Sequence, residues 1–382
     1  MTPAEADDHH YREGAATLRP GSGFFRSDSR PARDLGVLLL AVLARQGPVQ
    51  VLDAMAGCGI RSLRYGLEAG VTSLWVNDAD PDRLPLLQAN LAQLPAAVAH
   101  RCTVVTAQQL LATCLRRRRR FTFVDLDAFG CPSALVPLAL EAVRFGGVLY
   151  LASSDGRSPT GHDRPAALRR FAAAARAHPA SWELALRLQL AVVARAAWAL
   201  GRGIEPLFSF SEGRTFRTGV RLRRRPEPGQ EAQLGLLAHC HGCGEQQVQS
   251  LLRLGRWRLC CAAGSEAPLA VSGPLWIGPL QDAAMLVAMQ EAAEALPGSL
   301  SAPGLRLLER LAADPGDLAR CWPLALIARR LQGGPPRPQD LVRELRAAGW
   351  RAQRSGVMEG QLRSDAPWDE ILAAARRVRA AK

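Results

Sequence analysis

The sequence predicts an α/β protein built on a doubly wound, mostly parallel sheet, and three observations carry this prediction. A buried strand at residues 49–53 runs into a glycine turn and then a helix. Short apolar strands alternate with helical segments up to residue 156, a rhythm typical of parallel sheets with helices on both faces. Three strands also end near a carboxylate, at the sheet edge where such folds bind ligands; these carboxylates are Asp53, Asp78 and Asp127.

The elements follow one another at short intervals. Residues 14–30 are rich in Gly, Ser, Arg and Phe without a period, which predicts an ordered or ligand-gated loop. Pro81 suits the first turn of a helix, where its missing N–H does no harm. We expect helices at 33–43, 80–94, 134–143, 166–177 and 182–200, strands at 73–77, 103–105, 121–124 and 147–152, and a closing hairpin within 208–222.

The chain divides at residues 223–229, whose arginines, prolines and glycine predict a linker. We expect a first domain at residues 1–227 and a smaller α+β domain at residues 228–382. The second domain ends in helical segments and a short hairpin between residues 338 and 363. This end is similar to a winged helix, which serves either nucleic-acid binding or packing.

The net charge of +13 on 382 residues favours a polyanionic partner, most simply a nucleic acid. Lys382 is the only lysine, so part of the excess is a compositional preference for arginine. The five arginines at 116–120 are either a solvated helix end or a phosphate-binding knob. An odd number of cysteines predicts reduced thiols, and no segment resembles a membrane span or a secretory signal, so we expect a cytoplasmic protein. The oligomeric state is left open.

The glycine turn predicts a nucleoside-type ligand. Gly57 and Gly59 let the backbone turn sharply and approach a bound molecule, and Asp78 stands where such units meet ribose hydroxyls. A dinucleotide site would have a third glycine close behind, where Ser62 and Leu63 stand. The turn therefore favours S-adenosylmethionine, which has no pyrophosphate, over a nicotinamide cofactor.

Cysteines of the second domain resemble an incomplete zinc ribbon. The four candidate ligands are Cys240, Cys243, Cys260 and Cys261. The first two form a CxxC pair, but the last two are adjacent, and Ala263 stands where a second CxxC would end. Because adjacent cysteines rarely ligate one metal with good geometry, we expect no metal. Zinc at these cysteines is the alternative, with His239 or His241 able to complete the site.

An array of motifs runs in order through nearly the whole chain: residues 24–34, 51–54 with 59–61, 77–78, 125–130, 154–156 and 273–280. This array resembles the tRNA (guanine-N2) dimethyltransferases that act at position 26. The resemblance implies a Rossmann-like class I methyltransferase domain that depends on S-adenosylmethionine, followed by a C-terminal tRNA-binding domain. It implies tRNA, and not DNA, as the partner.

The resemblance also implies roles for residues of this chain. Asp127 would face the guanine amino group, and Phe24 with Phe129 would sandwich the flipped base. Four residues depart from the family pattern: Thr106 replaces an aspartate, Ala128 a proline, Phe25 a tyrosine and Arg26 an asparagine. Together with the strand end and glycine turn described above, the implied cofactor-binding residues are Arg33, Asp53, Gly57, Gly59, Arg61, Asp78, Thr106 and Ala107.

Asp127 has the chemistry that methylation of guanine N2 needs. The N2 lone pair is delocalised into the ring, so a carboxylate that accepts a hydrogen bond from the amino group aims it and stabilises the growing positive charge. Stacking between Phe24 and Phe129 would offset the cost of unstacking the base. The expected products are N2-methylguanosine and N2,N2-dimethylguanosine. Two alternatives stay open: another RNA guanine as the target, and a tRNA-binding protein with a decayed site.

Overall fold

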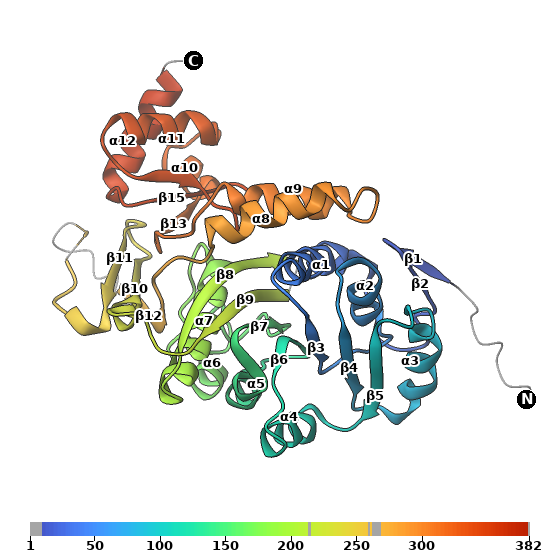
Figure 1. Cartoon of the computed structure of the whole chain (residues 1–382). Coiled ribbons are helices and arrows are strands. Elements are labelled where there is room, and N and C mark those ends of the chain that lie inside the picture. The colour runs from blue at the N-terminus through green and yellow to red at the C-terminus, as the bar shows by residue number, and fades with distance from the viewer. Residues whose placement is uncertain (1–9, 213–214, 259, 262–268, 381–382) are drawn as a thin grey trace, which may run out of the picture.

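The computed structural model describes residues 10–212, 215–258, 260–261 and 269–380. Its centre is a seven-stranded sheet with the order β5-β4-β3-β6-β7-β9-β8 (Figure 1). Neighbouring strands from β5 to β7 are parallel, whereas β9 runs antiparallel to both β7 and β8. The predicted doubly wound, mostly parallel sheet and its closing hairpin are confirmed. The strands are β3 (Gln50–Asp53), β4 (Ser73–Asp78), β5 (Ala99–Val104), β6 (Phe121–Ala128), β7 (Val143–Ser153), β8 (Gly203–Glu212) and β9 (Thr215–Arg223).

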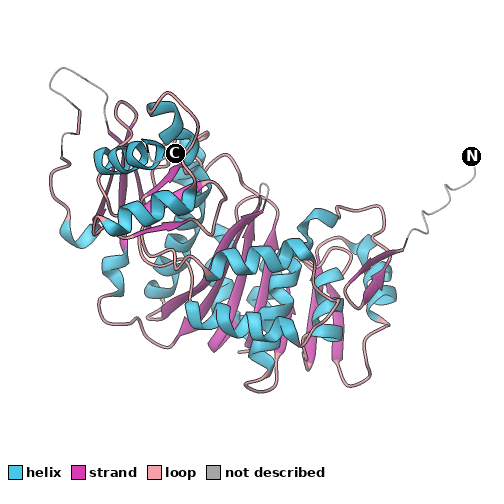
Figure 2. Ribbon diagram, turned by 90° about the horizontal axis from the view of Figure 1, so that it is seen from above, coloured by secondary structure: helices cyan, strands magenta, loops and turns pink. Residues whose placement is uncertain are grey.

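Helices cover both faces of this sheet (Figure 2), which explains why its central strands are continuous apolar runs. They are α1 (Arg30–Ala44), α2 (Ile60–Glu68), α3 (Leu84–Leu91), α4 (Ala107–Arg116), α5 (Val136–Ala142), α6 (Arg164–Phe171) and α7 (Ser181–Ala199). One hydrophobic core joins α1, α2 and α3 to the sheet, and a second joins α4, α5 and α7 to it. Within the described residues, no helix is long and apolar enough to cross a membrane.

The segment before α1 is more regular than predicted. Strands β1 (Tyr11–Glu13) and β2 (Ala16–Leu18) form a short antiparallel hairpin where part of a loop was expected. Glu13 is fully buried, and its Oε1 accepts hydrogen bonds from Arg33 Nε at 2.7 Å and Arg64 Nη1 at 2.9 Å. Strands of three residues are too short to show a period in the sequence, which is why the prediction was wrong there.

One helix is shorter than predicted. Helix α6 ends at Phe171, although its composition predicted a helix as far as residue 177. Ala172 takes a left-handed conformation with φ of 47°. Ala174 and Gly273 then exchange two backbone hydrogen bonds of 2.8 Å. Pairing with a strand from the second half of the chain overrides the helical propensity of this alanine-rich segment.

The C-terminal part contains two small three-stranded sheets. The first has the order β11-β10-β12 and the second has the order β13-β15-β14. Helices precede and follow the β14–β15 hairpin, as the winged-helix-like prediction requires. The elements are β10 (Leu234–Cys240), β11 (Gln246–Ser250), β12 (Leu269–Trp276), β13 (Cys321–Pro323), α10 (Leu324–Arg330), α11 (Pro338–Ala347), β14 (Ala352–Arg354), β15 (Gln361–Ser364) and α12 (Trp368–Ala380).

Two further helices of the second half, α8 (Ala283–Glu294) and α9 (Ala302–Ala312), pack on α1 (Figure 1). Met289 of α8 and Leu308 of α9 belong to the same hydrophobic core as α1. Asp34 of α1 accepts hydrogen bonds from the backbone N and the hydroxyl of Ser301, at 2.9 and 2.6 Å. Helix α9 is therefore fixed to α1 at its first turn. The division of the chain at residues 227 and 228 stays a prediction.

Candidate active site at the carboxyl edge of the sheet

Neighbouring strands deliver three carboxylates to one edge of the sheet. Asp53 ends β3 and pairs in register with Asp125 of β6, while Asp127 lies two residues further along β6. In the next strands, Asp127 is level with Ala152 of β7, and Ala152 is level with Arg217 of β9. The order of the strands therefore gathers these acids and one arginine at the edge where parallel sheets bind ligands.

Asp127 stands between two arginines. Arg217 Nη2 donates a hydrogen bond to Asp127 Oδ1 at 2.7 Å, and Arg61 Nη1 forms an ion pair with Asp127 Oδ2. Burial alone would raise the pKa of Asp127, but the positive charges of Arg61 and Arg217 outweigh it and hold that pKa below its usual value. The side chain is 27% exposed. Asp127 is thus an ionised carboxylate that a ligand can reach.

Asp53 and Asp125 are both fully buried, and the predicted contact of Asp53 with the cofactor stays a prediction. Asp53 Oδ2 accepts a hydrogen bond from Ser62 Oγ, and Asp125 Oδ2 accepts one from Tyr65 Oη, each at 2.7 Å. Burial and the neighbouring Asp125 raise the pKa of Asp53 to about 7, and burial also raises the pKa of Asp125. These two acids therefore belong to the buried framework of the sheet edge and not to its surface.

The glycine turn lies beside the end of β4. Gly57 and Gly59 have φ angles of 58° and 82°, which favour glycine. Gly57 N donates to Asp78 Oδ2 at 2.8 Å, and a Cβ built on Gly57 would meet nothing within 4 Å. A Cβ on Gly59 would lie 3.0 Å from Leu87. The open turn leaves room for a bound molecule, and the half-buried Asp78 carboxylate can accept hydrogen bonds from hydroxyl groups. The two together fit a nucleoside with free ribose hydroxyls.

Thr106 and Ala107 lie where β5 passes into α4. The side chain of Thr106 accepts a hydrogen bond from Gln109 N, and that of Gln109 accepts one from Thr106 N, so the pair forms a capping box. Ala107 is buried. The hydroxyl of Thr106 therefore caps the N-terminus of α4. The contact of Thr106 and Ala107 with an adenine ring stays a prediction.

Arg33 lies inside the core and holds the loop before α1. Its Nε donates to Glu13 Oε1 at 2.7 Å, and its Nη1 and Nη2 donate to the backbone oxygens of Arg26 and Ser27 at 3.0 and 3.2 Å. These contacts position the segment that carries Phe24. The direct contact of Arg33 with the cofactor stays a prediction.

Two large aromatic side chains stand exposed next to this edge. Phe24 is 66% exposed and Phe129 is 72% exposed. Their rings meet edge to face, with centroids 4.9 Å apart and planes at 75°. Phe129 follows Asp127 by two residues, and the turn is fixed where Ser154 Oγ accepts a hydrogen bond from Gly130 N at 2.8 Å. An exposed aromatic pair beside a reachable carboxylate favours a site for a planar ligand.

Comparison with known proteins agrees with this geometry. The sequence model of a family described as N2,N2-dimethylguanosine tRNA methyltransferase matches residues 16–376. The chain belongs to this family. Among its relatives is a tRNA (guanine(26)-N(2))-dimethyltransferase from Methanosphaerula palustris, which is 32% identical over 92% of this chain and 91% of that protein. A protein of the same name from Pyrococcus abyssi is 28% identical over 89% of each chain.

A solved structure agrees with the family assignment. Trm1 from Pyrococcus horikoshii, determined as a complex with S-adenosyl-L-methionine, matches with a TM-score of 0.83 and 25% sequence identity. The match covers 96% of this chain and 99% of that one. The predicted fold, a Rossmann-like class I methyltransferase domain followed by smaller sheets, is thereby confirmed.

Arg217 is a residue of this methyltransferase site that the motif analysis missed. It is almost fully buried in β9, which lies inside the sheet between β7 and β8. Its guanidinium also lies over the ring of Tyr150, with Cζ 4.7 Å from the ring centroid. A buried charge within a sheet needs an acidic partner. Because residue 217 lies in a predicted strand, this requirement could have indicated from the sequence that Arg217 pairs with an acid of the site.

The four cysteines of the second half come together even though two of them are adjacent. The Sγ atoms of Cys240, Cys243, Cys260 and Cys261 all lie within 4.8 Å of one another. In a tetrahedral zinc–thiolate site with Zn–S bonds near 2.3 Å, sulfur atoms are about 3.8 Å apart. His239 and His241 contact each other through their rings but are not part of the thiol group, and Ala263 lies outside the described residues. The thiol cluster could therefore hold zinc.

Proposed function

We propose that this family member transfers methyl groups from S-adenosylmethionine to the exocyclic N2 of a guanosine in tRNA, giving N2-methylguanosine and N2,N2-dimethylguanosine. Guanine 26 is named for its relatives, and we assign the same position here. The observation that carries the proposal is the ionised, reachable Asp127 beside the exposed Phe24 and Phe129. Residues 1–227 would carry out the transfer in the cytoplasm, and residues 228–382 would bind the tRNA.

The glycine turn and its neighbours would hold the cofactor. S-adenosylmethionine, when bound, supplies a methyl group on a positively charged sulfur. Gly57 borders open space, Gly59 completes the turn, and Asp78 offers a carboxylate to ribose hydroxyls. Arg61, at the first turn of α2, suits the carboxylate of the amino acid part. Because Arg61 also pairs with Asp127, one guanidinium would connect the cofactor site to the acid that faces the base.

Asp127 would orient the guanine amino group. Each of its oxygens has one arginine partner and retains lone-pair capacity for an N–H donor. A carboxylate with a lowered pKa is a weak general base, so it contributes mainly by aiming the nitrogen and by stabilising positive charge on it. Proton loss from a nitrogen that already carries positive charge is easy and does not need a strong base.

Phe24 and Phe129 would hold the plane of the flipped base. A base between two ring faces needs about 7 Å between the ring centroids, twice the distance of an aromatic contact. The observed separation is 4.9 Å, so the rings must part to admit a base. Stacking on both faces would then offset the cost of taking the guanine out of the tRNA stack.

The proposed function is tested by mass spectrometry of nucleosides from unmodified tRNA incubated with the protein and S-adenosylmethionine. We expect N2-methylguanosine to appear first and N2,N2-dimethylguanosine later, at position 26 when fragments are mapped. A guanine-26-to-adenine tRNA serves as the control and should stay unmethylated. Binding of tRNA without any methylation would favour the decayed-site alternative, and methylation elsewhere would favour another guanine.

We also propose that the thiol cluster, defined as Cys240, Cys243, Cys260 and Cys261, binds one zinc ion. Cys243 N donates to Cys240 Sγ at 3.5 Å, an N–H to sulfur contact suited to a thiolate. The turn between β10 and β11 also touches the winged-helix-like end, because Trp322 Nε1 donates to Gly244 O at 3.0 Å and Trp368 N donates to Glu245 Oε2 at 2.9 Å. Zinc would therefore brace the small sheet against that end.

Metal analysis of the purified protein tests the thiol cluster. We expect about one zinc per chain, and we expect Cys243→Ser to lose the zinc and to lower the melting temperature by roughly 5 °C or more, because structural zinc contributes folding free energy. Cys102→Ser is the matched control, since Cys102 lies in β5 outside the cluster. Equal stability of the two variants together with a zinc-free wild type would rule the site out.

A further inference from the structure

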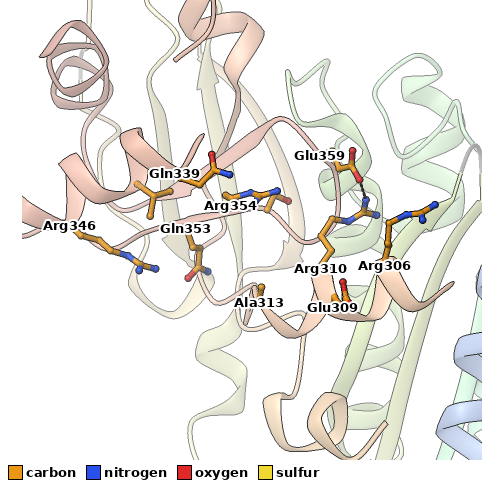
Figure 3. A pocket seen from close by; sticks show the side chains of 11 residues that line it. Arg306, Glu309, Arg310, Ala313, Gln339, Arg346, Gln353, Arg354 and Glu359 are labelled. Carbon is orange, nitrogen blue, oxygen red and sulfur yellow. Dashed lines mark hydrogen bonds and ion pairs between the residues drawn. The ribbon is translucent and has the colours of Figure 1, made fainter. Parts of the chain in front are cut away.

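A cavity of about 520 Å³ opens between α9, α11 and the β14–β15 hairpin (Figure 3). It lies in the C-terminal half. The sheet edge that carries Asp127 and Arg217, called here the methyl-transfer edge, contributes none of its lining residues. A cavity of this size is large enough for a nucleotide and larger than a single phosphate requires.

The elements around the cavity follow the winged-helix order. Helix α9 is followed by β13, α10, α11, β14 and β15, and the sheet order is β13-β15-β14. Helix α11 is then the last helix before the hairpin, the place of the recognition helix in helix-turn-helix proteins. The deep, narrow major groove of A-form RNA excludes such a helix. RNA bound here would be contacted through its backbone and its unpaired nucleotides.

Positive charge dominates the walls of the cavity. Four of its lining residues are Arg306, Arg310, Arg346 and Arg354, and two are Glu309 and Glu359. One of these glutamates is already neutralised, since Glu359 Oε1 pairs with Arg310 Nη1 at 2.8 Å. Within the described part of the chain, the side chains of Arg306 and Arg354 have no ion-pair partner. The walls therefore present more guanidinium groups than carboxylates can satisfy.

Two of the arginines are oriented by the backbone. Arg310 Nε donates to Gly356 O at 2.9 Å, and Arg346 Nε donates to Ala352 O at 2.8 Å. These bonds engage the Nε side of each guanidinium. Arg310 also pairs with Glu359, so of these two arginines Arg346 keeps its charge for a ligand. Planar guanidinium groups bind phosphate oxygens through paired N–H donors, which makes arginine well suited to recognising phosphate.

We infer that this cavity binds a nucleotide of the tRNA substrate at a point away from the target base. Arg306, Arg346 and Arg354 hold its phosphate, and Gln339 and Val342 of α11 face its ribose or base. The inference deepens the proposed function and rests on it, because the ligand is the tRNA that the methyl-transfer edge modifies. The site contributes to tRNA affinity and takes no part in methyl transfer itself.

The test compares two double variants that remove equal charge. Arg346→Gln with Arg354→Gln removes two of the four arginines of the cavity wall, whereas Arg376→Gln with Arg379→Gln removes two arginines from α12, outside it. We expect the first pair to raise the tRNA dissociation constant about tenfold and to lower the slope of log affinity against log salt by about 2. The second pair should change affinity less than twofold. At saturating tRNA, kcat of both should stay within twofold of wild type.

The outcomes separate the inference from the proposed function. Equal affinity loss in the two double variants, or none in the first, overturns the cavity assignment even if the wild type methylates tRNA. A wild type that never methylates tRNA, but whose affinity falls only in the first variant, supports the cavity and sinks the proposed activity. Unchanged melting temperatures establish that neither variant acts through unfolding.

Discussion

Asp127→Asn should lower the rate of methyl transfer to tRNA by roughly 10²–10³-fold, the range found when a group that stabilises transition-state charge is removed. The substitution keeps the shape and one oxygen of the side chain but removes its negative charge. It thereby weakens both the aim of the guanine amino group and the stabilisation of charge on its nitrogen. Affinity for S-adenosylmethionine, measured by calorimetry, should stay within a few fold because Asp78 and the glycine turn are untouched.

The control for Asp127→Asn addresses the stability cost of unpairing buried arginines, which is about 3–5 kcal/mol for a broken buried ion pair. Glu183→Gln removes a carboxylate of the same kind, because Glu183 Oε1 pairs with Arg187 Nε at 2.8 Å and with Arg363. This variant should melt at a lower temperature yet transfer methyl groups at a nearly normal rate while folded. Similar activity in the two variants would remove Asp127 from its assigned role.

Arg217→Met should shift the acidic limb of the pH–rate profile upward. Burial raises the pKa of Asp127, and Arg61 and Arg217 lower it. With Arg217 gone, Arg61 alone opposes burial, so the pKa of Asp127 rises and its ionised fraction falls at acidic pH. Each unit of that rise costs tenfold in rate below the pKa. We therefore expect a larger loss of rate near pH 6 than near pH 8.

A shifted pH profile distinguishes positioning from general destabilisation. Arg187→Met is the matched control, because Arg187 is also fully buried and ion-paired, but its partner is Glu183 and not Asp127. It should lower the melting temperature and leave the pH profile in place. Arg217→Lys should recover part of the wild-type profile, since lysine restores the charge without the fork that reaches two acids. A profile that stays fixed in Arg217→Met would show that Asp127 is held ionised by other means.

The parts of the site that the sequence predicted are those encoded locally. The turn at Gly57 and Gly59 follows from backbone conformations that only a few neighbouring residues determine, and Asp78 follows from its place at a strand end. The exposed pair of Phe24 and Phe129 came from the family resemblance, and the structure places the two rings in contact.

The parts that the sequence did not predict depend on contacts between distant segments. Arg217 meets Asp127 across 90 residues, because β9 inserts between β7 and β8. Helix α6 stops where Ala174 pairs with Gly273, an event that its own composition opposes. The thiol cluster joins Cys240 and Cys243, at the end of β10 and the turn after it, to the adjacent Cys260 and Cys261, which lie between β11 and β12. The cysteine spacing expected of a zinc ribbon includes a second CxxC pair, and this chain departs from that spacing.

The first turn of α1 joins both ends of the RNA-binding surface proposed here. Arg33 ties down the backbone that carries Phe24, and the next residue, Asp34, ties down the start of α9 through Ser301. Helix α9 leads to the cavity lined by Arg306 and Arg310. If both proposed sites are occupied, these contacts fix the distance between the flipped base and the nucleotide held in the cavity. A tRNA with an inserted nucleotide between these two points should then present the wrong base.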